Sequence, residues 1–164
     1  MIRTPILRYC RARIDPAVRV HTGEDVTQEV LMAVCEALPR YRPGEVPAMA
    51  FVYGIARNKV ADSMRLTGRD KSDPTNEMPD RVSTSLEPEA GALRSAQAGQ
   101  LRALLNRLPP SHREVLVLRV AMQLSTAETA RTVGTTPGAV RVTQHRALAR
   151  LRALLADQMT EPAT

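Results

Sequence analysis

The chain is poor in large aromatic side chains. Its 164 residues include no tryptophan, one phenylalanine and three tyrosines, whereas alanine, leucine, valine and arginine are abundant. Small aliphatic side chains suit the cores of small helical bundles better than the cores of sandwiches or barrels. The composition therefore predicts an all-α fold.

Cysteine and long apolar runs are also scarce. Cys10 and Cys35 are the only cysteines and lack metal-ligand spacing, so we expect two buried thiols in a reducing compartment rather than a disulfide or a redox site. No apolar run approaches a membrane span, and no signal sequence is visible. These absences predict a cytoplasmic protein without a metal or a cofactor.

Positive charge is in excess. The formal net charge is +6 and the sequence pI is about 10.1, which points to a polyanionic partner such as nucleic acid. The length suits one ordinary domain or two small ones, and the helical patterns below favour two.

Residues 125–152 have the pattern of a helix-turn-helix. Ser125 and Glu128 form a capping-box sequence, which predicts a helix start at that point. Gly134 supplies the permissive conformation that the turn needs, and Ala130 and Val140 have the spacing of the shared core. Pro137 lies near the first position of the second helix, where its missing N–H has no cost.

The second helix of this pattern is basic. Arg141, His145 and Arg146 lie on one broad side of it, while apolar residues face inward. A helix of this kind fits the DNA major groove, where arginine pairs with guanine edges. The alternative is an arginine-rich helix whose charges are simply solvated.

Two helices are predicted in the first part of the chain. Thr22 and Asp25 can cap a helix that runs to about Leu38, with a buried stripe and an outer face that carries Asp25, Gln28 and Glu29. A second helix, at about 47–67, exposes a mainly basic face that includes Asn58. Taken alone, both outer faces are compatible with ordinary solvated surfaces. The buried stripe of the first helix comprises Val26, Val30, Ala33, Val34 and Leu38.

The periodicity fails between the two halves. The segment from 67 to 91 is acidic and proline-rich, which predicts a flexible linker. Beyond it, a helix with Leu104 and Leu108 on its apolar side leads to a second capping-box sequence, Ser111 and Glu114, which predicts another helix start. We expect two small helical domains at 1–67 and 96–158, with a flexible acidic linker at 68–95.

With both halves placed, the chain resembles the extracytoplasmic-function (ECF) group of RNA polymerase sigma factors, most closely its sigma factor D type. In the first half the resemblance lies in EDVTQEVLMAVCEALPRYR and AFVYGIARNKVADSMR. In the second half it lies in LPPSHREVLVLRVAMQLSTAETA and GAVRVTQHRALARLR. Both stretches in this order, on either side of an acidic segment, make the similarity specific.

The resemblance implies a sigma factor without catalytic activity. Region 2 would bind the β′ clamp helices of RNA polymerase through the helix that bears Asp25, Gln28 and Glu29. It would also open the −10 promoter element and capture an unstacked base near Tyr41 and Asn58. A tyrosine that is simply packed in its loop is the alternative for Tyr41.

Region 4, by the same resemblance, would contact the β flap and bind the −35 element. Its DNA-facing positions would be Arg141, His145 and Arg146, with Arg150 at a phosphate. The resemblance further implies an anti-sigma partner. It also implies one more helix ahead of Met1, so we expect an incomplete core in the first half.

Two other classes of protein stay open. A helix-turn-helix repressor or activator would need a dimerisation surface or an effector pocket, and the first half has neither an evident coiled seam nor a ligand motif. A DNA recombinase would need a nucleophile, and no serine or tyrosine stands in a recognisable catalytic arrangement.

Overall fold

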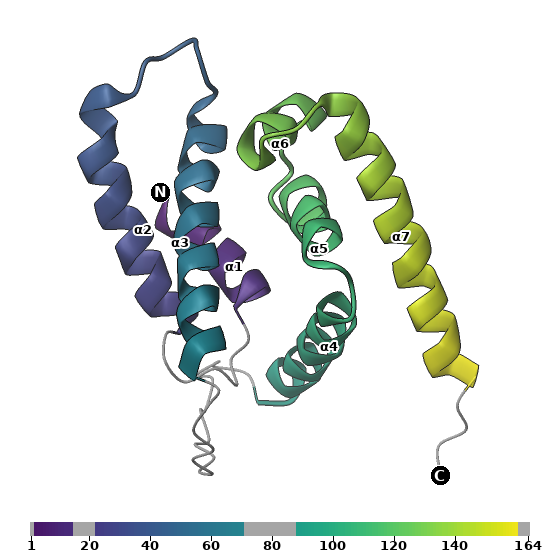
Figure 1. Ribbon diagram of the computed structural model, residues 1–164. Helices are drawn as coiled ribbons and strands as arrows, with labels where there is room; N and C mark the ends of the chain where they lie inside the picture. The colour runs from purple at the N-terminus through teal and green to yellow at the C-terminus, as the bar shows by residue number, and fades with distance from the viewer. Residues whose placement is uncertain (1, 15–21, 71–87, 161–164) are drawn as a thin grey trace.

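The computed structural model describes residues 2–14, 22–70 and 88–160, with side chains in 2–14, 22–66 and 96–158. Within these ranges every regular element is helical, as the composition predicts. The fold is therefore all-α, with one group of helices before residue 71 and another after residue 87 (Figure 1).

Three helices build the first half. They are α1 (Arg3–Arg13), α2 (Gly23–Ala37), which continues into the short 3₁₀ turn η1 (Leu38–Arg40), and α3 (Ala48–Asp70). The predicted cap of α2 is confirmed, because the Thr22 hydroxyl accepts from the Asp25 N–H at 3.2 Å and the Asp25 carboxylate accepts from the Thr22 N–H at 2.9 Å. Helix α1 is too short to be stable alone, and it packs against α2 and α3.

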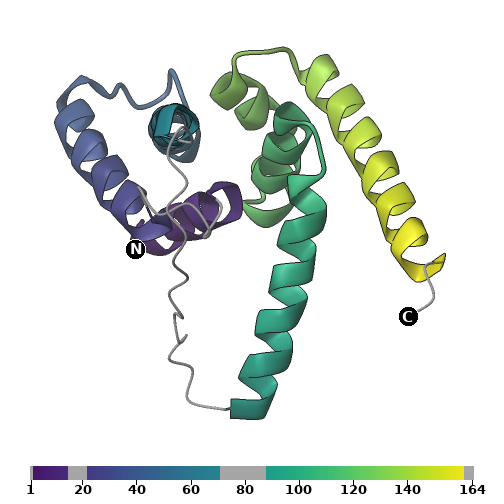
Figure 2. The same ribbon diagram turned by 60° about the horizontal axis from the view of Figure 1, so that its bottom comes forward.

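The second half contains four helices and a π-helical turn. They are α4 (Pro88–Asn106), α5 (Pro110–Leu116), the turn η2 (Val117–Ala121), α6 (Thr126–Val133) and α7 (Pro137–Thr160). Figures 1 and 2 show α5 and α6 between the first half and α7, which forms the outer edge of the molecule.

The predicted linker at 68–95 overlaps the end of α3 and the start of α4. Helix α3 extends to Asp70 and α4 already begins at Pro88. The rest of that segment, 71–87, lies outside the described residues. So do residues 15–21, for which the sequence predicts a loop, and 161–164, the end of a tail at 159–164 that the sequence predicts to be frayed. The domain boundaries and the flexibility of the linker therefore stay predictions.

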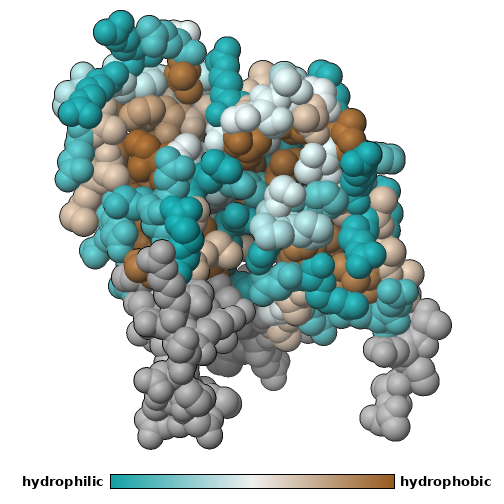
Figure 3. Space-filling model, in the orientation of Figure 1, coloured by the Kyte–Doolittle hydropathy of each residue, from teal (hydrophilic) through white to brown (hydrophobic). Residues whose placement is uncertain are grey.

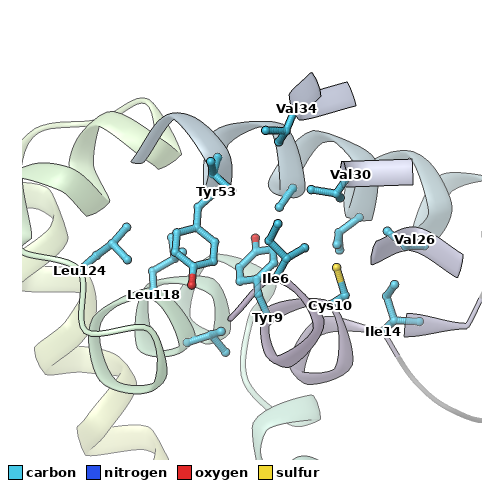
Figure 4. Packing of buried hydrophobic residues seen from close by; sticks show 14 residues of the cluster. Ile6, Tyr9, Cys10, Ile14, Val26, Val30, Val34, Tyr53, Leu118 and Leu124 are labelled. Atoms are coloured by element: carbon cyan, nitrogen blue, oxygen red, sulfur yellow. The ribbon is translucent and has the colours of Figure 1, made fainter. Parts of the chain in front are cut away.

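One hydrophobic cluster joins the two halves. Its members from α1, α2 and α3 include Tyr9 and Tyr53, whose ring centroids are 5.4 Å apart. Val117, Leu118 and Leu124 from the second half belong to the same cluster, and Figure 4 shows Leu118 and Leu124 beside Tyr53. The core of the first half is thus packed against side chains from the second half.

Several predicted core positions are instead exposed. Leu38 ends the predicted stripe of α2, but its side chain is 57% exposed because η1 turns it away from the bundle. Helical spacing also predicts a buried Val120, four residues after Leu116, but its side chain is 60% exposed, since the π-helical turn η2 shifts the helical phase after Leu116. Cys10 is buried as predicted, but Cys35 is exposed, so the prediction of two buried thiols is wrong for Cys35. Burial raises the pKa of the Cys10 thiol to about 11.

The predicted cap at Ser111 and Glu114 is wrong. Helix α5 begins at Pro110, two residues earlier than a cap at Ser111 requires, and no side chain caps it. Glu114 therefore lies too far into the helix to reach back to the first free N–H group. The carboxylate points instead to the first half of the chain.

Glu114 is the centre of a buried polar cluster between the halves. Its Oε1 accepts a hydrogen bond from the Tyr9 hydroxyl at 3.2 Å and lies 3.1 Å from Nε of Arg57. Its Oε2 is 3.9 Å from Arg13 Nη2, and Arg13 also donates to the Pro110 carbonyl at 3.2 Å. Burial and the adjacent carboxylate both raise the pKa of Tyr9. The cluster, together with the shared core, fixes how α5 lies against α1 and α3.

The surface is mixed in polarity. On the face shown in Figure 3, hydrophilic and hydrophobic side chains are interspersed over both halves. Among the described residues, no helix has the length and apolar character that crossing a membrane requires.

Candidate nucleic-acid interface

The helix-turn-helix forms as the sequence predicts. The Ser125 hydroxyl accepts from the Glu128 N–H at 3.1 Å, and the Glu128 carboxylate accepts from the Ser125 N–H at 2.7 Å. These hydrogen bonds from Ser125 lower the pKa of Glu128. Gly134 ends α6 in the left-handed conformation, with φ of 75°, which residues other than glycine rarely adopt.

The start of α7 is set by a cap that the sequence analysis did not identify. The Thr136 hydroxyl accepts from the Ala139 N–H at 3.2 Å, directly before Pro137, the first residue of the helix. A threonine followed by a proline is the local signal that indicates this cap. The turn and both caps together hold α7 at a defined angle to α6.

The inward face of α7 is apolar. Val140 and Ala147 are fully buried, Leu154 is 4% exposed, and Leu148 and Leu151 are half-buried. Val140 packs with Ala130 of α6 and Val115 of α5. This packing leaves the four predicted DNA-binding residues of the helix exposed: Arg141, His145, Arg146 and Arg150.

Arg119 fixes the middle of α7 to η2. Its Nε donates to Oε1 of Gln144 at 3.0 Å, and its Nη1 donates to the Leu124 carbonyl. From the sequence we expect this arginine to carry its charge outward on a long apolar stem. In the structure it is half-buried and connects η2 to α7 and to the loop before α6, which restricts rotation of α7 about its axis.

The two ends of the predicted DNA face differ in their surroundings. Arg146 and Arg150 line a concavity of about 610 Å³ between α7 and the turn that joins α4 to α5. Arg141 and His145 do not line it and lie on the same helix nearer its start. The concavity brings in two basic residues that the sequence analysis missed, Arg107 and His112, along with Leu108, Pro109 and Ala149.

The predicted polymerase-binding residues lie together near the start of α2. Asp25 and Gln28 are exposed and Glu29 is half-buried. The Asp25 carboxylate accepts hydrogen bonds from both the backbone and the hydroxyl of Thr22. Asp25 therefore has a structural role at the helix start, whatever it binds besides.

The two residues predicted to capture a −10 base differ in exposure. Asn58 is exposed on α3. Tyr41 is half-buried, with its ring 4.9 Å from that of Phe51 and its hydroxyl donating to the Val46 carbonyl at 2.9 Å. These contacts favour the packed-loop alternative for Tyr41, and its stacking role stays a prediction.

The basic face predicted on α3 is partly neutralised. Arg57 forms its ion pair with Glu114, and Arg65 forms one with Asp62 on the same helix. No ion pair involves Arg141, His145, Arg146 or Arg150 within the described ranges. The basic face of α7 therefore keeps its positive charge unpaired within the described ranges.

Two family models match the chain. The model described as Sigma-70 region 2 matches residues 3–70, and the model described as Sigma-70, region 4 matches residues 98–151. The first match contains α1, α2 and α3, and the second contains the helix-turn-helix.

Curated relatives match over most of the chain. The ECF RNA polymerase sigma factor SigD of Mycobacterium tuberculosis is 48% identical over 152 residues, which cover 92% of this chain and 72% of the relative. The ECF RNA polymerase sigma factor ShbA of Streptomyces griseus is 50% identical over 153 residues, which cover 90% of this chain and 80% of the relative.

Solved structures share the fold. The sigma factor RpoE of Bartonella quintana, in complex with the anti-sigma factor NepR, superposes with a TM-score of 0.69 at 22% identity, covering 94% of this chain and 92% of that one. CnrH, in complex with the cytosolic domain of CnrY, gives a TM-score of 0.67 at 25% identity, covering 94% and 82%. With both region models matched in order and relatives near 50% identity, the chain belongs to the ECF group of sigma-70 family RNA polymerase sigma factors.

Proposed function

We propose that this sigma factor binds the −35 promoter element through α7. The observation that carries the proposal is the exposed and unpaired basic face of a capped helix-turn-helix. The start of such a helix enters the major groove, which places Arg141 and His145 near base edges. Arg146 comes directly after His145, and Arg150 lies about one turn beyond Arg146, where the sugar-phosphate backbone passes the helix.

The first half has the complementary role in this proposal. The start of α2, with Asp25, Gln28 and Glu29, binds the β′ clamp helices of the polymerase core. Asn58 on α3 and the loop of Tyr41 hold an unstacked base of the −10 element, which offsets the few kcal/mol that base extrusion costs. Tyr41 can stack on a base only if its ring leaves Phe51.

An anti-sigma partner and the β flap complete the set of proposed partners. The RpoE structure contains the anti-sigma factor NepR, and its fold likeness supports a partner of that class for this chain. A helix-turn-helix repressor is the less favoured alternative, because both region models match in the order found in sigma factors.

Run-off transcription tests the proposal directly. Core RNA polymerase is incubated with and without the full chain on a pool of promoter fragments from the source genome. Specific new transcripts are expected, and their start sites will reveal the −35 and −10 elements together. If the chain binds DNA as a dimer but does not bind core polymerase, the repressor alternative replaces the proposal.

A substitution in α7 tests the DNA-binding face. Arg146→Ala is expected to weaken binding to a −35 duplex about tenfold, because the exposed guanidinium supports DNA binding rather than folding. The affinity is measured by fluorescence anisotropy with a labelled duplex, and folding is checked by circular dichroism. An unchanged affinity in a well-folded variant would remove Arg146 from the interface.

A further inference from the structure

The concavity beside α7 gathers positive charge from two separate parts of the chain. Arg146 and Arg150 come from α7, whereas Arg107 comes from the turn after α4 and His112 from α5. Leu108 below them is 3% exposed and holds the turn against Ala147 and Leu154 of α7. The turn therefore keeps Arg107 and His112 beside α7.

The basic groups of the concavity have no acidic neighbours in its lining. The lining contains three arginines and one histidine and no aspartate or glutamate. None of the three arginines forms an ion pair with another described residue. By contrast, Arg113, one residue after His112, is buried and donates to Oδ1 of Asn106.

His112 adds a second observation. Its Nδ1 is buried and has no hydrogen-bond partner within the described part of the chain. Burial of a polar atom without a partner is unfavourable. An anion in the concavity would provide an acceptor for a hydrogen bond from the histidine ring, and acceptors for the N–H groups of the arginines.

We propose that this concavity binds one phosphate of the DNA backbone, with Arg107 and His112 as contacts outside the helix-turn-helix. The inference rests on the proposed binding of DNA by α7. A phosphate held between α7 and the turn at 107–109 would fix the helix at a second point, and so set its register in the groove. This site would raise affinity for all duplexes without reading their sequence.

The test compares Arg107→Ala with Arg152→Ala in the full chain. Both substitutions remove one positive charge from an exposed arginine of the second half, but Arg152 does not line the concavity. Each variant is titrated against two labelled duplexes, a promoter fragment selected by run-off transcription and an unrelated sequence of equal length. The titrations are repeated at several salt concentrations.

Arg107→Ala is expected to weaken binding to both duplexes by a similar factor, about fivefold. The plot of log affinity against log salt concentration should also become less steep by about one unit of slope, which is expected when one phosphate contact is lost. His112→Gln should change binding in the same direction by a smaller factor. Arg152→Ala should leave the slope closer to that of the unsubstituted chain.

Other results would overturn the assignment. If Arg107→Ala and Arg152→Ala have equal affinities and slopes, the concavity does not bind DNA. If Arg107→Ala weakens only the promoter duplex, the residue reads sequence. If the unsubstituted chain binds inorganic phosphate at micromolar concentration in calorimetry, with Arg107 required, the site is for a free anion. If the run-off assay fails but the chain binds the unrelated duplex and Arg107→Ala weakens that binding, the result contradicts the sigma activity of the chain and still supports the phosphate contact.

Discussion

Two segments of this chain have the same capping-box sequence but different structures. In 125–128, serine and glutamate bond to each other's backbone N–H groups and begin α6. In 111–114, the same residue types are already inside α5, and Glu114 bonds to the first half of the protein. A capping-box sequence thus indicates a helix start only when the residue before it does not begin the helix first.

Proline accounts for the difference. Pro110 is pre-organised for the first helical position and needs no partner for a missing N–H, so α5 starts there and Ser111 becomes its second residue. Glu114 is then available to Tyr9, Arg13 and Arg57. In the other segment Leu124 precedes Ser125 and is held by a backbone bond to Leu118, which leaves Ser125 at the cap position.

The largest expected effect comes from removing the buried charge. Glu114→Gln leaves Arg13, whose side chain is 8% exposed, without its carboxylate. Breaking a buried pair in this way costs about 3–5 kcal/mol of unfolding free energy. The measurement is urea unfolding followed by circular dichroism, because the chain has no tryptophan.

Glu45→Gln provides the matched control for that substitution. Its pair with Arg42 is exposed, at 69% and 79% for the two side chains, and loss of such a pair costs less than about 1 kcal/mol. Small-angle X-ray scattering of Glu114→Gln should also show a larger radius of gyration, because the cluster holds the two halves together. A variant as stable and compact as the unsubstituted chain would contradict the role of Glu114.

Alanine substitutions of Ser125 and Ser111 should also differ in their effect on the unfolding free energy, by a smaller amount. Ser125→Ala removes a helix cap and should cost about 1 kcal/mol of unfolding free energy. Ser111→Ala should change it by less than about 0.5 kcal/mol, because the hydroxyl is exposed and caps no helix. Urea unfolding of both variants checks the difference, and equal losses would show that Ser111 also acts as a cap.

The smallest expected effect is a pH dependence of the unfolding free energy that arises from Glu128 in the cap of α6. The pKa of Glu128 is lowered from 4.5 by its hydrogen bonds with Ser125. A carboxylate with a lowered pKa stabilises the fold above its unfolded pKa, and this contribution is lost as the pH falls through the folded value. The stability difference between the unsubstituted chain and Glu128→Gln should therefore shrink from about pH 6 to about pH 3.

A difference that stays constant over that range would show that Glu128 acts through something other than its charge. Glu45→Gln again serves as a control, because the Glu45 side chain is 69% exposed and its pair with Arg42 spans 3.9 Å. Together the three tests separate a local cap, which depends on one serine, from a tertiary contact, which depends on both halves.

Some features of the predicted DNA-binding surface follow from local sequence, and others depend on tertiary contacts. The exposure of Arg141, His145 and Arg146 follows from helical spacing, because Val140 and Ala147 on either side of them face the core. Arg146 and Arg150 line one concavity with Arg107 and His112, and no local sequence pattern predicts this. It depends on how Leu108 packs against α7, which periodicity within one helix does not specify.

By itself, the sequence determined the all-α fold, the starts of α2 and α6, the turn at Gly134 and the basic face of α7. Each depends on hydrogen bonds or side-chain spacing within a few residues, so local chemistry is sufficient. Only the tertiary structure decided the partners of Glu114, the core shared by both halves and the basic concavity. The Tyr9 hydroxyl and the Glu114 carboxylate, for example, are 105 positions apart, and the folded backbone alone brings them together.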